Sequence, residues 1–513
     1  MIQTSHKILL GGNWSASSDA QAAFHAWNPA TGESLPDSYP VSGTGDINAS
    51  LAAGKTAAQE LEQIDPEVRA GFLDQYAQAI QDDAERLAET ASRETGLPLR
   101  PRLLEVEIPR TVNQLRQAAH WTREGSWQRA TIDTASNIRS HLAPLGGPVI
   151  IFGPNNFPFA FNAVSGGDFA AAIAAGNPVI AKAHPAHPET SRLLAKLASD
   201  ASQEFGLPGA TVQMLYHFPN ELGMVLVSAT ETAAVAFTGS RPGGMRLKAA
   251  ADAAGVPIYL ELSSLNPVFV LPGSVRERGS AIASELAGSC NLGGGQFCTK
   301  PGLIVLEGGA DSAGFISTMR QSFADAPEPV LLMADSASRI KESLEVLTAA
   351  GAEILAGGSP GTRAGFRFQP TLLKVSGTTF LKEATALQRE AFGPVALLVV
   401  ADDEKQMPAI ASAMDGNLTA TVYSDSAGTD DNLYQEITTI VRPRVGRLLN
   451  DKVPTGVAVV PSMQHGGPFP ATGHPGFTSV GLPASICRFA ALQCYDSVRP
   501  HRLPKALADA NPN

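Results

Sequence analysis

The sequence predicts an α/β protein in which two parallel sheets, each covered by helices on both faces, follow one another along the chain. From Gly147 onward, short apolar runs typical of buried strands alternate with helical segments, which is the pattern of βαβ crossovers. The alternation starts again near Pro267, and 513 residues suffice for several domains. Two α/β domains in sequence fit these observations better than one very wide sheet.

Helices are expected before the first sheet, over residues 45–120, where apolar residues recur at helical spacing among good helix formers. The second of these segments is closed by Gly96, Leu97 and Pro98. The runs that predict the first sheet are PVIIFG, PVIAK, TVQML, AVAFTGS and PIYLEL, and those of the second are PVFVL, GLIVLEG, ALLVV and RVGRLLND.

Two segments alternate polar and apolar residues and do not belong to the alternating series of strands and helices. They are GSWQRATIDT near residue 130 and ALQCYDSVRP near the C-terminus. We expect them to pair as strands with each other or with another subunit.

Composition favours a small-molecule ligand. The chain has 38 basic and 49 acidic residues, a net charge of −11, so attraction to nucleic acid or to an anionic membrane is not expected. Four cysteines are too few for a disulfide framework, and the first residues lack a signal peptide, so we expect reduced thiols and a cytoplasmic location. The most apolar window, residues 157–183, is interrupted by Gly, Asp, Asn and Pro and cannot form a membrane span.

Cys298 is the first candidate for chemistry because it follows three glycines in NLGGGQFCTKPG. Glycines permit a close backbone approach, so main-chain N–H groups and a thiolate nucleophile can meet one ligand oxygen there. A buried structural thiol in a flexible loop is an equally good interpretation of the cysteine alone.

Glu261 lies in the apolar run PIYLELSSLNPV, where a buried carboxylate would have a raised pKa and act as a general base. The alternative, an exposed position on a half-buried strand, is favoured when the residue is considered alone. Asn155 and Asn156 follow a strand between two prolines, where an amide can donate to an oxyanion, although turn chemistry also explains them.

Two strand-to-helix junctions suit a dinucleotide: the one at Lys182, and FTGS, where Gly239 and Ser240 open a helix whose N-terminus favours a phosphate. The spacing does not match the GxGxxG fingerprint.

Together, GPNNFPF, AGNPVIAK, FTGS, LELSSLNP, GGGQFCTKPG and EAFGPV occur in order over residues 153–395, and the chain resembles the aldehyde dehydrogenase superfamily. NNFPFAF, KAHPAHPETS, FTGSRPGG and SMQHGGPFPA are similar to the branch of α-ketoglutaric semialdehyde (2,5-dioxovalerate) dehydrogenases and related bacterial aliphatic aldehyde dehydrogenases. The resemblance implies a modified Rossmann cofactor domain, an α/β catalytic domain and a small β oligomerisation element. Their expected bounds are 1–124 with 148–264, then 265–478, and 125–147 with 479–513.

The resemblance also implies roles for the candidate residues. Cys298 rather than Cys290 would attack the aldehyde to give a thiohemiacetal, Asn156 would stabilise its oxyanion, and Glu261 would activate water to hydrolyse the resulting thioester. Lys182 would contact the adenosine ribose, Ser240 the pyrophosphate and Glu390 the nicotinamide ribose. Phe152, Gly239 and Phe392 are placed in the cofactor site as well, and no metal is expected.

NADP is the expected cofactor, with NAD possible. Many relatives that prefer NAD carry a glutamate three residues after the lysine, whereas this chain has Pro185, so nothing there repels a 2′-phosphate. His184 and His187 would add polar contacts; the absence of an arginine in the segment, and a simple turn-capping role for the histidines, keep NAD open.

For the substrate, the resemblance places His465 beside the thiol, where it would lower the thiol pKa or position the aldehyde, unless it is only a satisfied histidine in a glycine-rich loop. It also places Arg110 on the helix face that lines the entrance, in a funnel with Phe157 and Phe159, where a guanidinium would bind a carboxylate. Arg102 and Arg116 are equally available, and a solvated Arg110 is the alternative.

The expected function is NAD(P)-dependent oxidation of α-ketoglutaric semialdehyde to 2-oxoglutarate by a homodimer or homotetramer. The alternatives are an aliphatic or fatty aldehyde dehydrogenase and a catalytically silent structural member of the family.

Overall fold

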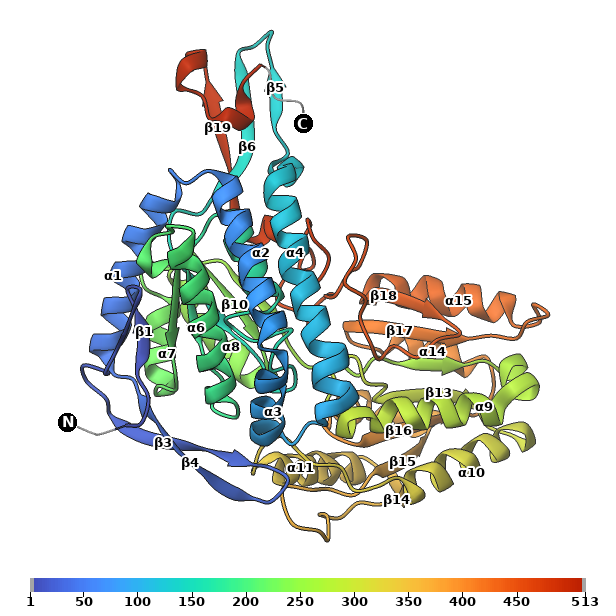
Figure 1. Ribbon diagram of the computed structural model, residues 1–513. Helices are drawn as coiled ribbons and strands as arrows, with labels where there is room; N and C mark the ends of the chain where they lie inside the picture. The colour runs from blue at the N-terminus through green and yellow to red at the C-terminus, as the bar shows by residue number, and fades with distance from the viewer. Residues whose placement is uncertain (1–3, 510–513) are drawn as a thin grey trace.

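The computed structural model describes residues 4–509, so the outermost ends of the first and last expected domain ranges lie outside the described residues (Figure 1). The first sheet has the order β11-β10-β7-β8-β9-β1-β2. Its five parallel strands are the predicted ones, β7 (Val149–Phe152), β8 (Val179–Lys182), β9 (Val212–Leu215), β10 (Ala234–Thr238) and β11 (Ile258–Glu261). The N-terminal strands β1 (Ile8–Leu10) and β2 (Asn13–Ser15) extend one edge in antiparallel pairing.

The order of these strands locates a binding crevice. The chain runs from β7 through β8 to β9 in one direction and then returns to place β10 on the other side of β7. In open parallel sheets, ligands bind beyond the carboxyl ends of the strands at such a reversal. Phe152 ends β7 and Thr238 ends β10, so the reversal lies between them.

Helices surround the first sheet, and one predicted boundary follows from a helix cap. The predicted second helical segment is two helices, α2 (Pro66–Asp82) and α3 (Ala84–Thr95), and Gly96 ends α3 in a left-handed conformation. The others are α1 (Thr44–Leu61), α4 (Ile108–Glu124), α5 (Gly167–Ala175), α6 (Pro188–Glu204), α7 (Asn220–Val227) and α8 (Arg241–Ala253). A π-helical turn, η1 (Leu99–Glu107), precedes α4.

The second sheet has the order β14-β15-β16-β13-β12-β17-β18, with β14 (Glu353–Ala356) antiparallel to its neighbour. The predicted strands are β12 (Val268–Val270), β13 (Leu303–Glu307), β16 (Val395–Ala401) and β18 (Val445–Asn450), while β14, β15 (Thr371–Ser376) and β17 (Asn417–Tyr423) were not anticipated. Its helices are α9 (Pro272–Asn291), α10 (Ala310–Asp325), α11 (Ser336–Ala349), α12 (Gly377–Lys382), α13 (Ala384–Leu387), α14 (Gln406–Ser412) and α15 (Asp431–Val441).

The two outlying segments join one small antiparallel sheet, which projects from the top of the molecule in Figure 1. Its strands are β5 (Thr131–Asp133), β6 (Ile138–Pro144) and β19 (Ala490–Asp496). β6 lies between the other two, so the two segments share a sheet without pairing directly. The hairpin of β3 (Ala22–Asn28) and β4 (Glu33–Val41) reaches the second domain, where the Phe366 N–H donates to the Pro29 carbonyl at 2.8 Å.

Short 3₁₀ turns complete the described chain: η2 (Ser126–Gln128), η3 (Gly209–Thr211), η4 (Leu292–Gly295), η5 (Arg442–Arg444), η6 (Ile486–Phe489), η7 (Pro500–Arg502) and η8 (Lys505–Leu507). Within residues 4–509, no helix combines the length and apolar character needed to traverse a bilayer.

Candidate active site

Cys298 follows α9 and η4 in a loop that only glycine permits. Gly293, Gly294 and Gly295 all have positive φ, and a Cβ on Gly295 would lie 2.1 Å from the Gly393 carbonyl oxygen. Cys290 is fully buried at the end of α9, where its Sγ donates to the Pro301 carbonyl at 3.2 Å. Of these two cysteines, Cys298 is therefore the one beside other reactive groups.

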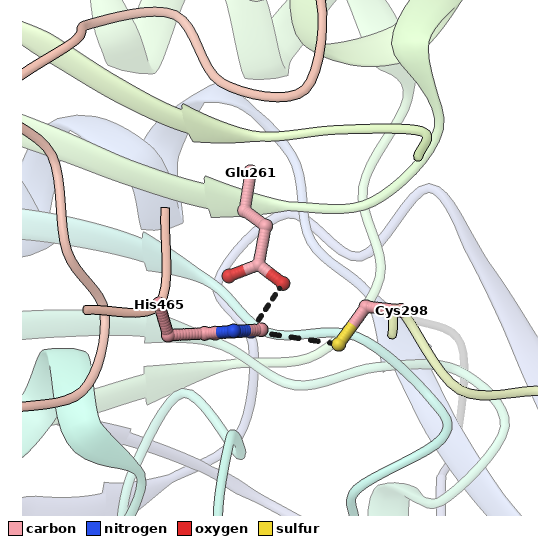
Figure 2. A group of neighbouring side chains, drawn as sticks. All are labelled: Glu261, Cys298 and His465. Carbon is pink, nitrogen blue, oxygen red and sulfur yellow. Dashed lines mark hydrogen bonds and ion pairs between the residues drawn. The ribbon is translucent and has the colours of Figure 1, made fainter. Parts of the chain in front are cut away.

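Cys298, His465 and Glu261 converge from three separate parts of the chain (Figure 2). The His465 Nε2 atom lies 3.5 Å from Cys298 Sγ and 2.9 Å from Glu261 Oε1. Glu261 ends β11 and is 1% exposed, and His465 is 2% exposed. The other carboxylate oxygen of Glu261 accepts a hydrogen bond from Ser479 Oγ at 3.0 Å. Glu261 thus faces inward, against the exposed alternative.

The surroundings of Glu261 and Cys298 shift the pKa values of both side chains. Burial alone raises the pKa of Glu261, but the charge and hydrogen bonds of His465, with hydrogen bonds to Ser479 and Cys298, lower it overall. The expected raised pKa is therefore wrong. Burial and the Glu261 carboxylate hold the pKa of the Cys298 thiol well above its ordinary value. The free protein therefore combines a charged carboxylate with a neutral thiol. Because its Nε2 faces the thiol, His465 is placed to take the thiol proton when the nucleophile forms.

Asn156 lies in the turn after β7 and is buried. Its Nδ2 donates to the Gln296 carbonyl at 2.8 Å, two residues before Cys298, which ties the amide to the cysteine loop. The Asn156 carbonyl in turn accepts from Arg102 Nη2 at 3.0 Å. The amide is therefore held against the loop that carries Cys298.

Arg102 and Glu107 support this turn and were not singled out as a pair by sequence reasoning. Arg102 forms an ion pair with the fully buried Glu107, whose Oε1 accepts from the N–H groups of Phe159 and Ala160 at 2.8 and 3.0 Å. The Arg102 guanidinium also lies 4.5 Å from the centroid of the Phe157 ring. The sequence marks Glu107 only as an acidic residue at the start of α4, and its pairing with Arg102 depends on the π-helical turn η1.

An apolar cluster joins the cysteine loop through Phe297, and its membership corrects one prediction. Phe157 packs against Phe161 and Phe297, with ring centroids 5.2 and 5.4 Å apart. Phe159 is instead fully buried in the core of the first domain. The segment is an irregular turn, so the side-chain directions of Phe159 and Phe161 do not follow a regular period. The other members of the cluster are Ala160, Val457, Val459, Met463 and Val480.

Arg110 extends from α4 over these rings. Its guanidinium carbon lies 5.7 Å from the Phe157 centroid and 5.4 Å from that of Phe161. Nη1 donates to the Val457 carbonyl at 3.0 Å, whereas Nη2 is buried and has no partner among the described residues. Burial lowers the Arg110 pKa. Arg110 therefore faces inward, against the solvated alternative, whereas Arg116 is bonded to Gln78 and Gln81 at an exposed position.

The cofactor candidates gather at the strand reversal. Lys182 ends β8, and burial lowers its pKa to about 8. Ser240 caps α8 by position only, without a side-chain hydrogen bond, so the first N–H groups of α8 are free to meet a phosphate. Phe152 packs near Phe237, at 6.1 Å between centroids. These features fit the phosphate and ribose of a dinucleotide.

Glu390 and Phe392 approach from the second domain. Burial raises the pKa of Glu390 to about 7, opposed by the nearby Lys300 charge and a hydrogen bond from Ser263. Lys300 Nζ donates to the carbonyls of Ala391 and Val395, which fixes this loop to the cysteine loop. Phe392 is 38% exposed, leaving its ring open to contact a ligand.

No unpaired carboxylate occupies the segment after Lys182. Pro185 stands where the glutamate of NAD-preferring relatives is expected, and Glu189 is paired with Arg192 at 2.6 Å. His184 Nδ1 accepts from the Ala186 N–H at 3.1 Å, and its ring stacks on that of His187. His187 is bonded to Pro154 and Ser191 and is structural. His217, after β9, has a buried Nδ1 without a partner in the described chain.

The family follows from comparison with known proteins. The model of the Aldehyde dehydrogenase family matches residues 14–441, so the chain belongs to this family and is an NAD(P)-dependent enzyme that oxidises aldehydes. Among curated relatives, α-ketoglutaric semialdehyde dehydrogenase 2 of Azospirillum brasilense is 36% identical over 100% of this chain and 98% of its own. The α-ketoglutaric semialdehyde dehydrogenase of Acinetobacter baylyi is 34% identical over 91% and 89%.

Solved structures agree on the fold. Aldehyde dehydrogenase C of Pseudomonas syringae, a cysteine-to-alanine mutant in complex with NAD+ and octanal, has a TM-score of 0.81 at 20% identity, covering 98% of each chain. The NAD+ complex of an aldehyde dehydrogenase from Bacillus cereus has a TM-score of 0.80 at 19% identity, covering 96% of each. The expected aldehyde dehydrogenase fold is confirmed.

Proposed function

We propose that this enzyme oxidises α-ketoglutaric semialdehyde to 2-oxoglutarate, with NADP as its preferred cofactor. The observation that carries the substrate is Arg110, which holds a buried guanidinium nitrogen without a partner among the described residues. It lies above an apolar cluster that includes Phe297, the chain neighbour of Cys298. A substrate with an aldehyde at one end and a carboxylate at the other matches this arrangement. The two semialdehyde dehydrogenases that resemble this chain support the same substrate.

The chain supplies each group that the reaction needs. Cys298 adds to the aldehyde carbon, its proton passing to His465, while Asn156 and the Cys298 N–H stabilise the oxyanion. A bound nicotinamide would supply the hydride acceptor, and Cys298 would then hold the acyl group as a thioester. Glu261 then removes a proton from water, which attacks the thioester and releases the carboxylic acid. These contacts also argue against a catalytically silent role.

Loss of the proposed carboxylate ligand should affect substrates selectively. Arg110→Ala should raise the KM for the semialdehyde by roughly tenfold or more, equivalent to about 1.4 kcal/mol, and leave that for hexanal nearly unchanged. Arg116→Ala, at the exposed position on the same helix, is the matched control and should change neither. Equal losses on both aldehydes would show that Arg110 has a structural role. They would favour the aliphatic alternative, which the apolar cluster also supports.

Cofactor choice is expected to depend on charge at residue 185. The unmodified enzyme should use NADP at least as well as NAD, because the carboxylate nearest to this segment, Glu189, is paired with Arg192. Pro185→Glu should shift the ratio of kcat/KM toward NAD by roughly tenfold or more through repulsion of the 2′-phosphate. Pro185→Ala controls for loss of the proline ring. Strict use of NAD by the unmodified enzyme would refute the preference.

We also propose that the enzyme is a cytoplasmic homodimer or homotetramer, with the domain bounds given by the sequence. β19 is an edge strand of the projecting sheet, and its Leu492 side chain is 70% exposed. An exposed edge with an apolar residue favours pairing with another subunit. Four cysteines without a disulfide support a reducing compartment.

A further inference from the structure

The side chains around Cys298 include each of the three ligand types that Zn²⁺ takes from proteins. They are the thiol of Cys298, the imidazole of His465 and the carboxylate of Glu261, and their ligand atoms all lie within 4.8 Å of one another (Figure 2). Each comes from a different element, so the fold rather than a local sequence motif assembles the set.

Two of the three distances between these atoms are close to those of a tetrahedral zinc site. Zinc bonds of about 2.3 Å to sulfur and about 2.0–2.2 Å to nitrogen and oxygen separate neighbouring ligand atoms by about 3.4–3.6 Å. Sγ and Nε2 are already 3.5 Å apart. Nε2 and Oε1 are 2.9 Å apart and need to separate by only about half an ångström. The third pair, Sγ and the carboxylate oxygen, lies within 4.8 Å and must approach by up to about 1.3 Å, so side-chain rotations are needed to admit the ion.

Hydrogen bonds from neighbouring residues also fix the positions of these ligands, as in known metal sites. Ser479 Oγ binds Glu261 Oε2, which leaves Oε1 facing His465 and the thiol. The backbone of His465 is fixed on both sides, because its N–H donates to Thr478 Oγ1 at 3.0 Å and its carbonyl accepts from the Ser479 N–H at 2.9 Å. Partners of this kind orient ligands and raise metal affinity.

We propose that Glu261, His465 and Cys298 form an inhibitory zinc site, at which Zn²⁺ reversibly blocks the enzyme. The thiol proton passes to the buffer, a Zn–S bond forms, and no electron is transferred. The ion takes the sulfur electron pair that attacks the aldehyde and the carboxylate that activates water, so acylation and hydrolysis stop together. This inference rests on the proposed roles of these residues and not on the identity of the aldehyde.

Cobalt(II) tests the site directly, because a tetrahedral thiolate site gives a sulfur-to-cobalt charge-transfer band and intense visible bands. Co²⁺ added to the apoenzyme should give both, with one ion per chain. Cys298→Ser should abolish the charge-transfer band, and His465→Asn should weaken Co²⁺ binding by roughly 100-fold or more. Cys494→Ser, which removes the exposed cysteine, is the control and should leave the spectrum unchanged. A band that survives Cys298→Ser, or equal affinity in His465→Asn, would overturn the site.

Zinc inhibition of ester hydrolysis, measured without cofactor, separates this inference from the proposed function. Added Zn²⁺ should abolish esterase activity, and EDTA should restore it. If Zn²⁺ blocks the esterase of an enzyme that does not oxidise the semialdehyde, the zinc site stands and the substrate is wrong. If the semialdehyde is oxidised and saturating Zn²⁺ leaves the esterase active, the zinc site is wrong and the function stands.

Discussion

Cys298→Ala is expected to reduce both dehydrogenase and esterase activity by roughly 10⁴-fold or more, because the nucleophile is common to the two reactions. The loss is expected at Cys298 because of the groups that surround its thiol. Cys298 has the glycine loop, the imidazole at 3.5 Å and the nearby Asn156 amide. Steady-state rates with an aldehyde plus cofactor, and with an activated ester alone, measure the two losses independently.

Cys290→Ala is the matched control for this experiment. Its thiol is buried eight residues earlier and is bonded to the Pro301 carbonyl, so its loss should affect packing and leave most of both activities. Substantial turnover by the Cys298 variant, or equal losses in the two variants, would contradict the assigned nucleophile.

Glu261→Gln should separate acylation from hydrolysis. The amide keeps the size of the carboxylate and its contact with Ser479 but cannot take a proton from water. A pre-steady-state burst of reduced cofactor should therefore persist, while steady turnover falls by roughly 10²-fold or more. Stopped-flow absorbance of the reduced nicotinamide records both phases in one experiment.

His465 provides the comparison that makes this result specific. It contacts both the thiol and the carboxylate, so His465→Gln should slow the burst itself, in contrast to Glu261→Gln. If the Glu261 variant lost burst and turnover together, the carboxylate would be needed before acylation. Its assignment as the base for hydrolysis would then be wrong.

The strands that build the cofactor site could be predicted from the sequence because each is a short, continuous apolar run. PVIIFG, PVIAK and AVAFTGS became β7, β8 and β10, and their carboxyl ends define the crevice. β17 was missed because NLTATVY mixes threonine with apolar residues, although the fold buries all seven positions. The tertiary setting decides its burial, and no local pattern records that setting.

In the candidate site too, some residues could be predicted from local sequence and others only from the fold. Glycines mark the Cys298 loop locally, whereas the contact of His465 with Glu261 joins residues 204 positions apart and follows only from the fold or from resemblance. The Phe159 prediction is wrong because the irregular turn that follows Pro158 has no side-chain period. Arg102 was considered only as a possible alternative to Arg110. Its bond to the Asn156 carbonyl depends on the π-helical turn, which the sequence pattern does not predict.

The acyl group on Cys298 is the most direct test of the proposed reaction. Glu261→Gln, mixed with α-ketoglutaric semialdehyde and NADP and quenched in acid, should contain one 2-oxoglutaryl group per chain, found by mass spectrometry on the peptide that carries Cys298. The account predicts this adduct only when aldehyde and cofactor are both present. Its absence when reduced cofactor has formed, or its presence on another residue, would contradict the account.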